Sequence, residues 1–278
     1  MQFRSYLYVT FFLLCFSPVN AAEKNSAVLG GIGTGKIEID SQGRLGGITI
    51  NHNPHQPIND PAGCFAAIAV ESENQTIVKR LYQDESNAGA VKTARVKFLY
   101  PFAGTAYEDP ELPVNVRLRA FSPVTPGDVD HSCFPAVVFE YTVENPGKKD
   151  LPVTLAMSWR NLLGLEGGVK DQIDHTGILR HKIFRSGGYA GILLQLSEPD
   201  AGGAAHNALG EQALVYRPSD GEKTALLPLW HPESDPVPFR MFLEKPDDFL
   251  HMKDGEFTRH QSSAPRPAAA AAARKIIP

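Results

Sequence analysis

The 278-residue chain is 42% hydrophobic and 21% charged, a composition that is typical of folded proteins and excludes a globally disordered chain. Its formal net charge is −4 and no basic field stands out, which argues against a nucleic-acid partner. The 24 glycines and 22 prolines are many for a helical protein and favour a β architecture rich in turns.

Residues 1–21 have the pattern of a secretory signal peptide. Arg4 provides a positive charge, residues 6–16 form an uncharged apolar run, and small residues precede an expected cut near Ala21. The run is shorter than the roughly 20 apolar residues that a membrane span needs, and no later segment of the sequence is long enough to cross a bilayer. We therefore expect a secreted or periplasmic protein without a membrane span.

The stretch GGIGTGKI at residues 30–37 looks at first like a phosphate-binding loop. Its spacing of glycines and Lys36 fits, but Ile37 lacks the hydroxyl group that such a loop places on a magnesium ion. A strand is predicted to follow, whereas a phosphate-binding loop leads into a helix. We therefore predict no nucleotide and interpret the glycines as a structural motif, in which backbones approach closely or adopt positive φ. This motif consists of Gly30, Gly31, Gly33 and Gly35.

Hydrophobic residues alternate with polar ones in much of the chain that follows. Residues 36–40 and 44–51 are predicted to form a hairpin, because isoleucines recur at every second position on each side of the turn SQG. No segment has a helical period over a dozen residues. We predict an all-β fold, a large antiparallel β-sandwich that spans residues 22–261. Further strands are predicted within 93–102, 112–121, 135–145, 151–159, 189–196 and 212–218.

The end of the sequence has a different composition. Residues 262–278 read SSAPRPAAAAAARKIIP, which is low in complexity and offers no alternating face to bury. We predict a disordered or low-complexity tail there.

Histidines and carboxylates near one another raise the question of a metal site. His52 and His55 cannot share a helical face, because prolines interrupt that segment, and no third ligand is adjacent. Asp128, Asp130 and His131 offer ligands that calcium could use, but a turn capped by its own carboxylates is the simpler interpretation. We predict no metal and no cofactor.

Two cysteines, Cys64 and Cys133, would remain after removal of the signal peptide. An even pair in an oxidising compartment can form one disulfide. Two buried thiols that never meet are the alternative, because the sequence does not place the two Cα atoms within bonding distance.

Carboxylate pairs of the kind that hydrolyse glycosides were also considered. Such a pair needs one carboxyl group held protonated beside another that stays ionised. Glu166 has an apolar, glycine-rich context that could raise its pKa, but nothing singles out its partner. No Ser-His-Asp or Cys-His arrangement can be assembled either. The residues therefore identify no catalytic group.

Three stretches taken together resemble glycoside hydrolase family 116, the family of bile-acid β-glucosidases or non-lysosomal glucosylceramidases. They are LGGIGTGKIEI, FSPVTPGDVDHSCFPAVVFEYTVENPG and LAMSWRNLLG, in this order along the chain. The resemblance is strongest over residues 28–164. It implies an N-terminal β-sandwich that precedes a C-terminal (α/α)6 barrel, with both catalytic carboxylates on the barrel.

The resemblance makes a non-catalytic N-terminal domain, from a truncated or split enzyme, the leading hypothesis. Its expected partners are a separate (α/α)6 catalytic barrel and carbohydrate. A freestanding secreted module that binds carbohydrate or another partner is the alternative, and an intact hydrolase that uses Glu166 is the weaker third. A domain without its barrel should expose an apolar docking face, for which Trp159 and Phe65 are the candidates.

Overall fold

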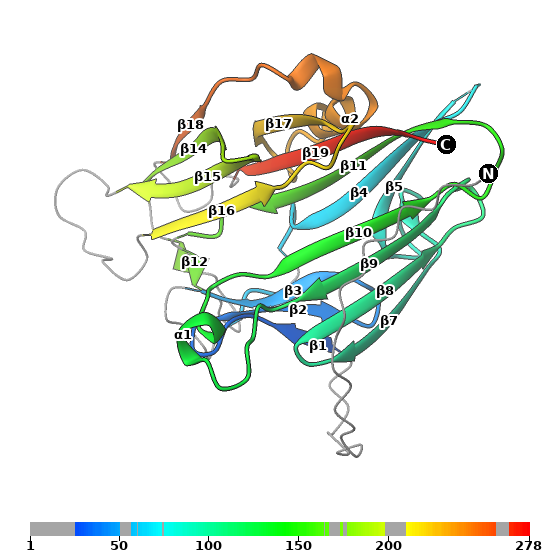
Figure 1. Ribbon diagram of the computed structural model, residues 1–278. Helices are drawn as coiled ribbons and strands as arrows, with labels where there is room; N and C mark the ends of the chain where they lie inside the picture. The colour runs from blue at the N-terminus through cyan, green and yellow to red at the C-terminus, as the bar shows by residue number, and fades with distance from the viewer. Residues whose placement is uncertain are drawn as a thin grey trace.

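The computed structural model describes residues 26–50, 57–59, 61–73, 75–163, 165–166, 173–174, 177–197, 210–259 and 267–278. The predicted signal peptide and the histidines at 52 and 55 lie outside these residues. Strands dominate the described chain, and nearly all of them pair antiparallel, which confirms the predicted all-β fold (Figure 1). None of the helices in this part of the chain is long and apolar enough to cross a membrane.

A six-stranded sheet forms the central layer of the fold. One of its faces is covered by helix α2 (Val237–Glu244), and the opposite face is covered by two other sheets. Its strands in spatial order are β17 (Lys223–Trp230), β19 (Ala268–Ile277), β11 (Leu151–Arg160), β4 (Phe65–Glu71), β5 (Thr76–Gln83) and β6 (Ala90–Val91).

A four-stranded antiparallel sheet packs on the β4 and β11 side of the central sheet and completes the sandwich (Figure 1). In β9 the predicted alternation is present, because Val116, Leu118 and Ala120 are buried while Arg117 and Arg119 are exposed. The buried residues belong to the main core, which lies between the two sheets. This sheet consists of β10 (Val138–Glu144), β9 (Asn115–Phe121), β8 (Phe102–Glu108) and β7 (Thr93–Leu99).

Three smaller sheets complete the described chain. The predicted hairpin is confirmed as β2 and β3, with β1 paired to β2. A second four-stranded sheet covers the β17 and β19 end of the central sheet through Ile192 and Leu194. The strands are β1 (Ser26–Leu29), β2 (Lys36–Asp40) and β3 (Leu45–Thr49); β16 (Gly210–Tyr216), β15 (Tyr189–Ser197), β14 (Gly177–Ser186) and β18 (Gly255–Arg259); and the pair β12 (Leu165–Glu166) and β13 (Ile173–Asp174).

The prediction of a low-complexity tail at 262–278 is wrong for its larger part. Residues Ala268–Ile277 form β19, which pairs with β11 on one side and β17 on the other. Alternation is absent because both faces of the strand are buried: Ala270 packs towards α2 and Ala271 towards β15. Small side chains suit this position, since large residues from both neighbouring layers supply the volume.

Candidate functional site

The glycine motif forms the connection between β1 and β2. Close backbone approach explains three of its members: a Cβ atom on Gly30 would lie 2.2 Å from the Gly35 oxygen, and one on Gly35 would lie 2.3 Å from the Thr49 oxygen. A Cβ atom on Gly31 would lie 2.4 Å from the Phe134 oxygen. Gly33 has open space around it but a φ of +75°, which favours glycine. These glycines thus have steric reasons to be present that need no bound phosphate.

The carboxylates of the PGDVDHS segment are organised around the short helix α1 (Val129–Ser132). Asp128 caps this helix by accepting a hydrogen bond of 3.1 Å from the His131 backbone N–H, and its other oxygen lies 2.6 Å from His131 Nδ1. This is the capped turn that the sequence favoured over a calcium loop. No group of three or more metal-ligating side chains occurs in the part of the chain that the structure describes.

The two cysteines are both free thiols in the structure, so the pairing that the sequence left open is not formed. Cys64 is buried at the start of β4 and accepts a hydrogen bond of 3.3 Å from the backbone N–H of Arg160. Burial raises the pKa of the Cys64 thiol to about 12. A thiol with such a pKa stays protonated at neutral pH and is a poor nucleophile.

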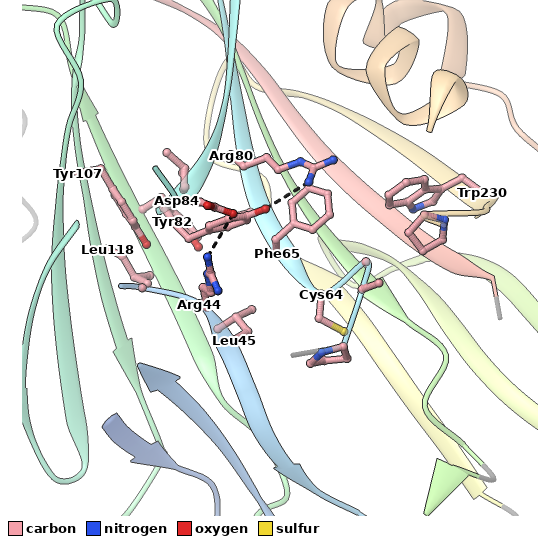
Figure 2. Close-up of a pocket in the computed structure, with 18 residues that line it drawn as sticks. Arg44, Leu45, Cys64, Phe65, Arg80, Tyr82, Asp84, Tyr107, Leu118 and Trp230 are labelled. Carbon is pink, nitrogen blue, oxygen red and sulfur yellow. Dashed lines mark hydrogen bonds and ion pairs between the residues drawn. The ribbon is translucent and has the colours of Figure 1, made fainter. Parts of the chain in front are cut away.

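A cleft of about 240 Å³ opens between the β2–β3 turn, the start of β4, the end of β5 and the inner face of the sheet formed by β7 to β10. Figure 2 shows Arg44, Tyr82 and Asp84 together, with Phe65 between them and Trp230. These side chains come from distant parts of the sequence, and of them only Phe65 was a candidate in the sequence analysis. No motif marks them, because only the folded sheets bring them together.

Two guanidinium groups set the charge of the cleft. Arg44 lies 3.2 Å from the Asp84 carboxylate, and its guanidinium carbon lies 5.5 Å from the centre of the Tyr82 ring. Arg80 donates a 3.2 Å hydrogen bond to the Tyr82 hydroxyl and stacks over Phe65 at 4.8 Å. With one carboxylate between two cations, the cleft is suited to bind oxygen-rich groups.

Asp84 is the one carboxylate among the residues that line this cleft. Hydrogen bonds from the Ser86 hydroxyl and backbone N–H lower its pKa, and the charges of Arg44 and Arg80 lower it further. Asp84 is therefore held ionised and cannot supply the proton that a glycosidase acid must donate. Retaining hydrolysis also needs a second carboxyl group about 5 Å away.

The remaining sequence candidates lie outside this cleft or in the core. Glu166 pairs with Ile173 through the backbone of β12 and β13, and its side chain lies outside the described part of the structure. The expectation that Phe65 marks an exposed docking face is wrong, because Phe65 is 7% exposed and packs edge-on against Trp230 and Phe239. Trp159 is partly buried against three hydrophobic clusters.

A comparison with protein families identifies the chain. The model described as "beta-glucosidase 2, glycosyl-hydrolase family 116 N-term" matches residues 26–278. The chain belongs to this family. The match agrees with the resemblance seen in the sequence and extends it over all the described strands, β19 included. A family 116 N-terminal domain normally pairs with a catalytic domain.

Proposed function

We propose that this chain is the non-catalytic β-sandwich domain of a β-glucosidase- or glucosylceramidase-like enzyme, and that it works by docking onto an (α/α)6 catalytic barrel. The observation that carries the proposal is the family match, which covers residues 26–278 and names the N-terminal part of the enzyme. In this view the acid and the nucleophile that act on the sugar are supplied by the barrel.

The chemistry of the cleft supports a non-catalytic role. Its single carboxylate, Asp84, is ionised and paired with Arg44, so the cleft lacks the separated acid and base of a glycosidase. Two of its aromatic rings are already covered by other side chains. Trp230 stacks on Phe239 with the ring centres 4.6 Å apart, and the Arg80 guanidinium lies over the Phe65 ring. These rings therefore offer little free face on which a sugar could stack.

The proposal predicts a stable complex between this chain and a catalytic domain. The probe is a separately produced catalytic domain of a family 116 β-glucosidase, mixed with the purified chain and analysed by size-exclusion chromatography with light scattering. We expect a one-to-one complex at micromolar concentrations, as for interfaces between domains that each fold alone. Two species that elute separately at all accessible concentrations would contradict the docking role.

A further inference from the structure

The cleft that Arg44 and Trp230 line contains two buried N–H donors that lack an acceptor. Arg44 Nε and Trp230 Nε1 are both shielded from solvent, and neither has a hydrogen-bond partner among the residues that the structure describes. The Trp230 residue as a whole is only 2% exposed. Buried polar groups in folded proteins almost always have a partner, so an unpaired donor needs an explanation. A bound molecule that brings acceptor oxygens into the cleft would provide one.

The charge of the cleft is positive overall. Arg44 and Arg80 both line it, and Asp84 supplies the one negative charge among the lining residues. Arg44 pairs with Asp84, whereas Arg80 bonds the neutral Tyr82 hydroxyl and stacks over the Phe65 ring. A ligand with one negative charge would neutralise the sum of these groups, and a cation would be repelled. A monocarboxylate has this charge, whereas a phosphate ester carries nearly two charges at neutral pH.

The remaining polar groups and the size of the cleft restrict the ligand further. Asp84 accepts two hydrogen bonds from Ser86 and pairs with Arg44, which leaves it room to accept one more, because a carboxylate has about four acceptor sites. A hydroxyl group on the ligand could donate that bond. The volume of about 240 Å³ lies below the roughly 300–1,000 Å³ of pockets for drug-sized molecules. A hydroxylated acid of about the size of a monosaccharide meets these conditions.

We infer that this cleft binds a small hydroxylated monocarboxylate of the sugar-acid class, with the Arg44 Nε–H donating to the carboxylate and the Trp230 Nε1–H donating to a second oxygen. Arg44 and Trp230 lie on opposite sides of Phe65 (Figure 2), so a molecule that reaches both must carry oxygens at two ends. Charge and hydrogen bonds provide the recognition, because Arg80 already covers the Phe65 ring. This binding does not depend on the proposed docking to a catalytic domain.

The test titrates D-glucuronate into the purified chain at low salt by isothermal titration calorimetry. We expect a dissociation constant at or below about 1 mM. Glucose has the same ring without the carboxylate, and it should bind at least about 10-fold more weakly because charge-assisted hydrogen bonds are the strong ones. Glucose 6-phosphate should also bind more weakly than glucuronate, since its charge exceeds that of the cleft.

Arg44→Lys tests the donor at the carboxylate. Lysine keeps a positive charge beside Asp84 but lacks the Nε–H and the planar fork, so glucuronate binding should weaken at least about 10-fold. The matched control is Arg95→Lys, because Arg95 also pairs with a carboxylate, Glu108 at 2.8 Å, but does not line the cleft. The control should keep the parent affinity, and equal thermal melts show that both variants fold.

The indole N–H signals in nitrogen-15 NMR spectra test the donor at the other end. The chain has two tryptophans, and Trp159→Phe assigns the signals. Glucuronate should shift the Trp230 signal and leave that of Trp159, which does not line the cleft, in place. No binding of glucuronate at millimolar concentrations, equal binding of glucose, tighter binding of glucose 6-phosphate, an equal loss in Arg95→Lys or an unmoved Trp230 signal would each overturn the inference. The docking role would stand in all of these cases.

Discussion

Replacing Ala270 with aspartate is expected to prevent the chain from folding. Ala270 is 0% exposed in β19, opposite Ser158 of β11 and Leu227 of β17. An unpaired carboxylate at this position would be buried between the central sheet and α2. Such burial costs more than about 4 kcal/mol, a large share of the roughly 5–15 kcal/mol that stabilises a domain.

The matched control is Ile276→Asp in the same strand, where the side chain is 61% exposed. A substitution at the surface should change the free energy of unfolding by no more than about 0.5 kcal/mol. Thermal melts followed by circular dichroism, together with the soluble yield, compare the two variants. A parent-like melting temperature for Ala270→Asp would contradict the burial of β19 and favour a disordered tail.

The stability of the chain is expected to fall as the pH drops from about 6.5 towards 4, because His181 is buried in its neutral form. His181 is 1% exposed, its Nδ1 bonds the Pro228 oxygen at 2.5 Å, and its Nε2 lies 3.2 Å from the Asn161 side-chain amide. Burial lowers the pKa of His181 from 6.5 to about 4, although the Pro228 contact opposes the shift, and the charge of His231 lowers it further.

The direction of this change in stability follows from the protonation of His181 in the folded and in the unfolded chain. Above pH 6.5 His181 is neutral in both the folded and the unfolded chain, so its full contribution to stability is present. As the pH falls towards 4, the unfolded chain takes up a proton that the folded chain does not, and stability is lost. The full shift corresponds to about 3 kcal/mol.

Chemical denaturation at a series of pH values, for the parent and for His181→Gln, measures this effect. Glutamine can keep the contacts to Pro228 and Asn161 but has no charge to gain, so this part of the pH dependence should disappear. His251→Gln at an exposed position is the control and should behave as the parent does. Parallel pH profiles for the parent and His181→Gln would show that His181 does not carry the effect.

Alternation in the sequence predicted β9 and other strands with one more exposed face, although it missed β8, and it failed for strands that are buried on both faces. In β9 burial follows the period of two, because the polar residues point to water, whereas in β2 and β3 the alternation of the sequence is only partly reflected in burial. Strand β4 was not predicted, because its first six residues are all buried and no alternation remains. Strand β19 was assigned to a tail for the same reason, and alanine's low β propensity concealed it further.

The candidate sites were predictable only where a motif lies in one segment. The glycine motif could be read as structural, because the strand that follows it excludes a phosphate-binding loop. The cleft could not be predicted, since Arg44, Tyr82 and Trp230 meet only through the packing of separate strands.

Release of nitrophenol from an aryl β-glucoside tests most directly the proposal that this chain does not itself hydrolyse glycosides. The assay uses the purified chain alone, with Asp84→Asn and Glu166→Gln as variants of the two carboxylates considered for catalysis. We predict that all three proteins release nitrophenol at the rate of the buffer blank. Turnover by the parent well above the blank that disappears in either variant would contradict the non-catalytic role and place an acid or a nucleophile on this domain.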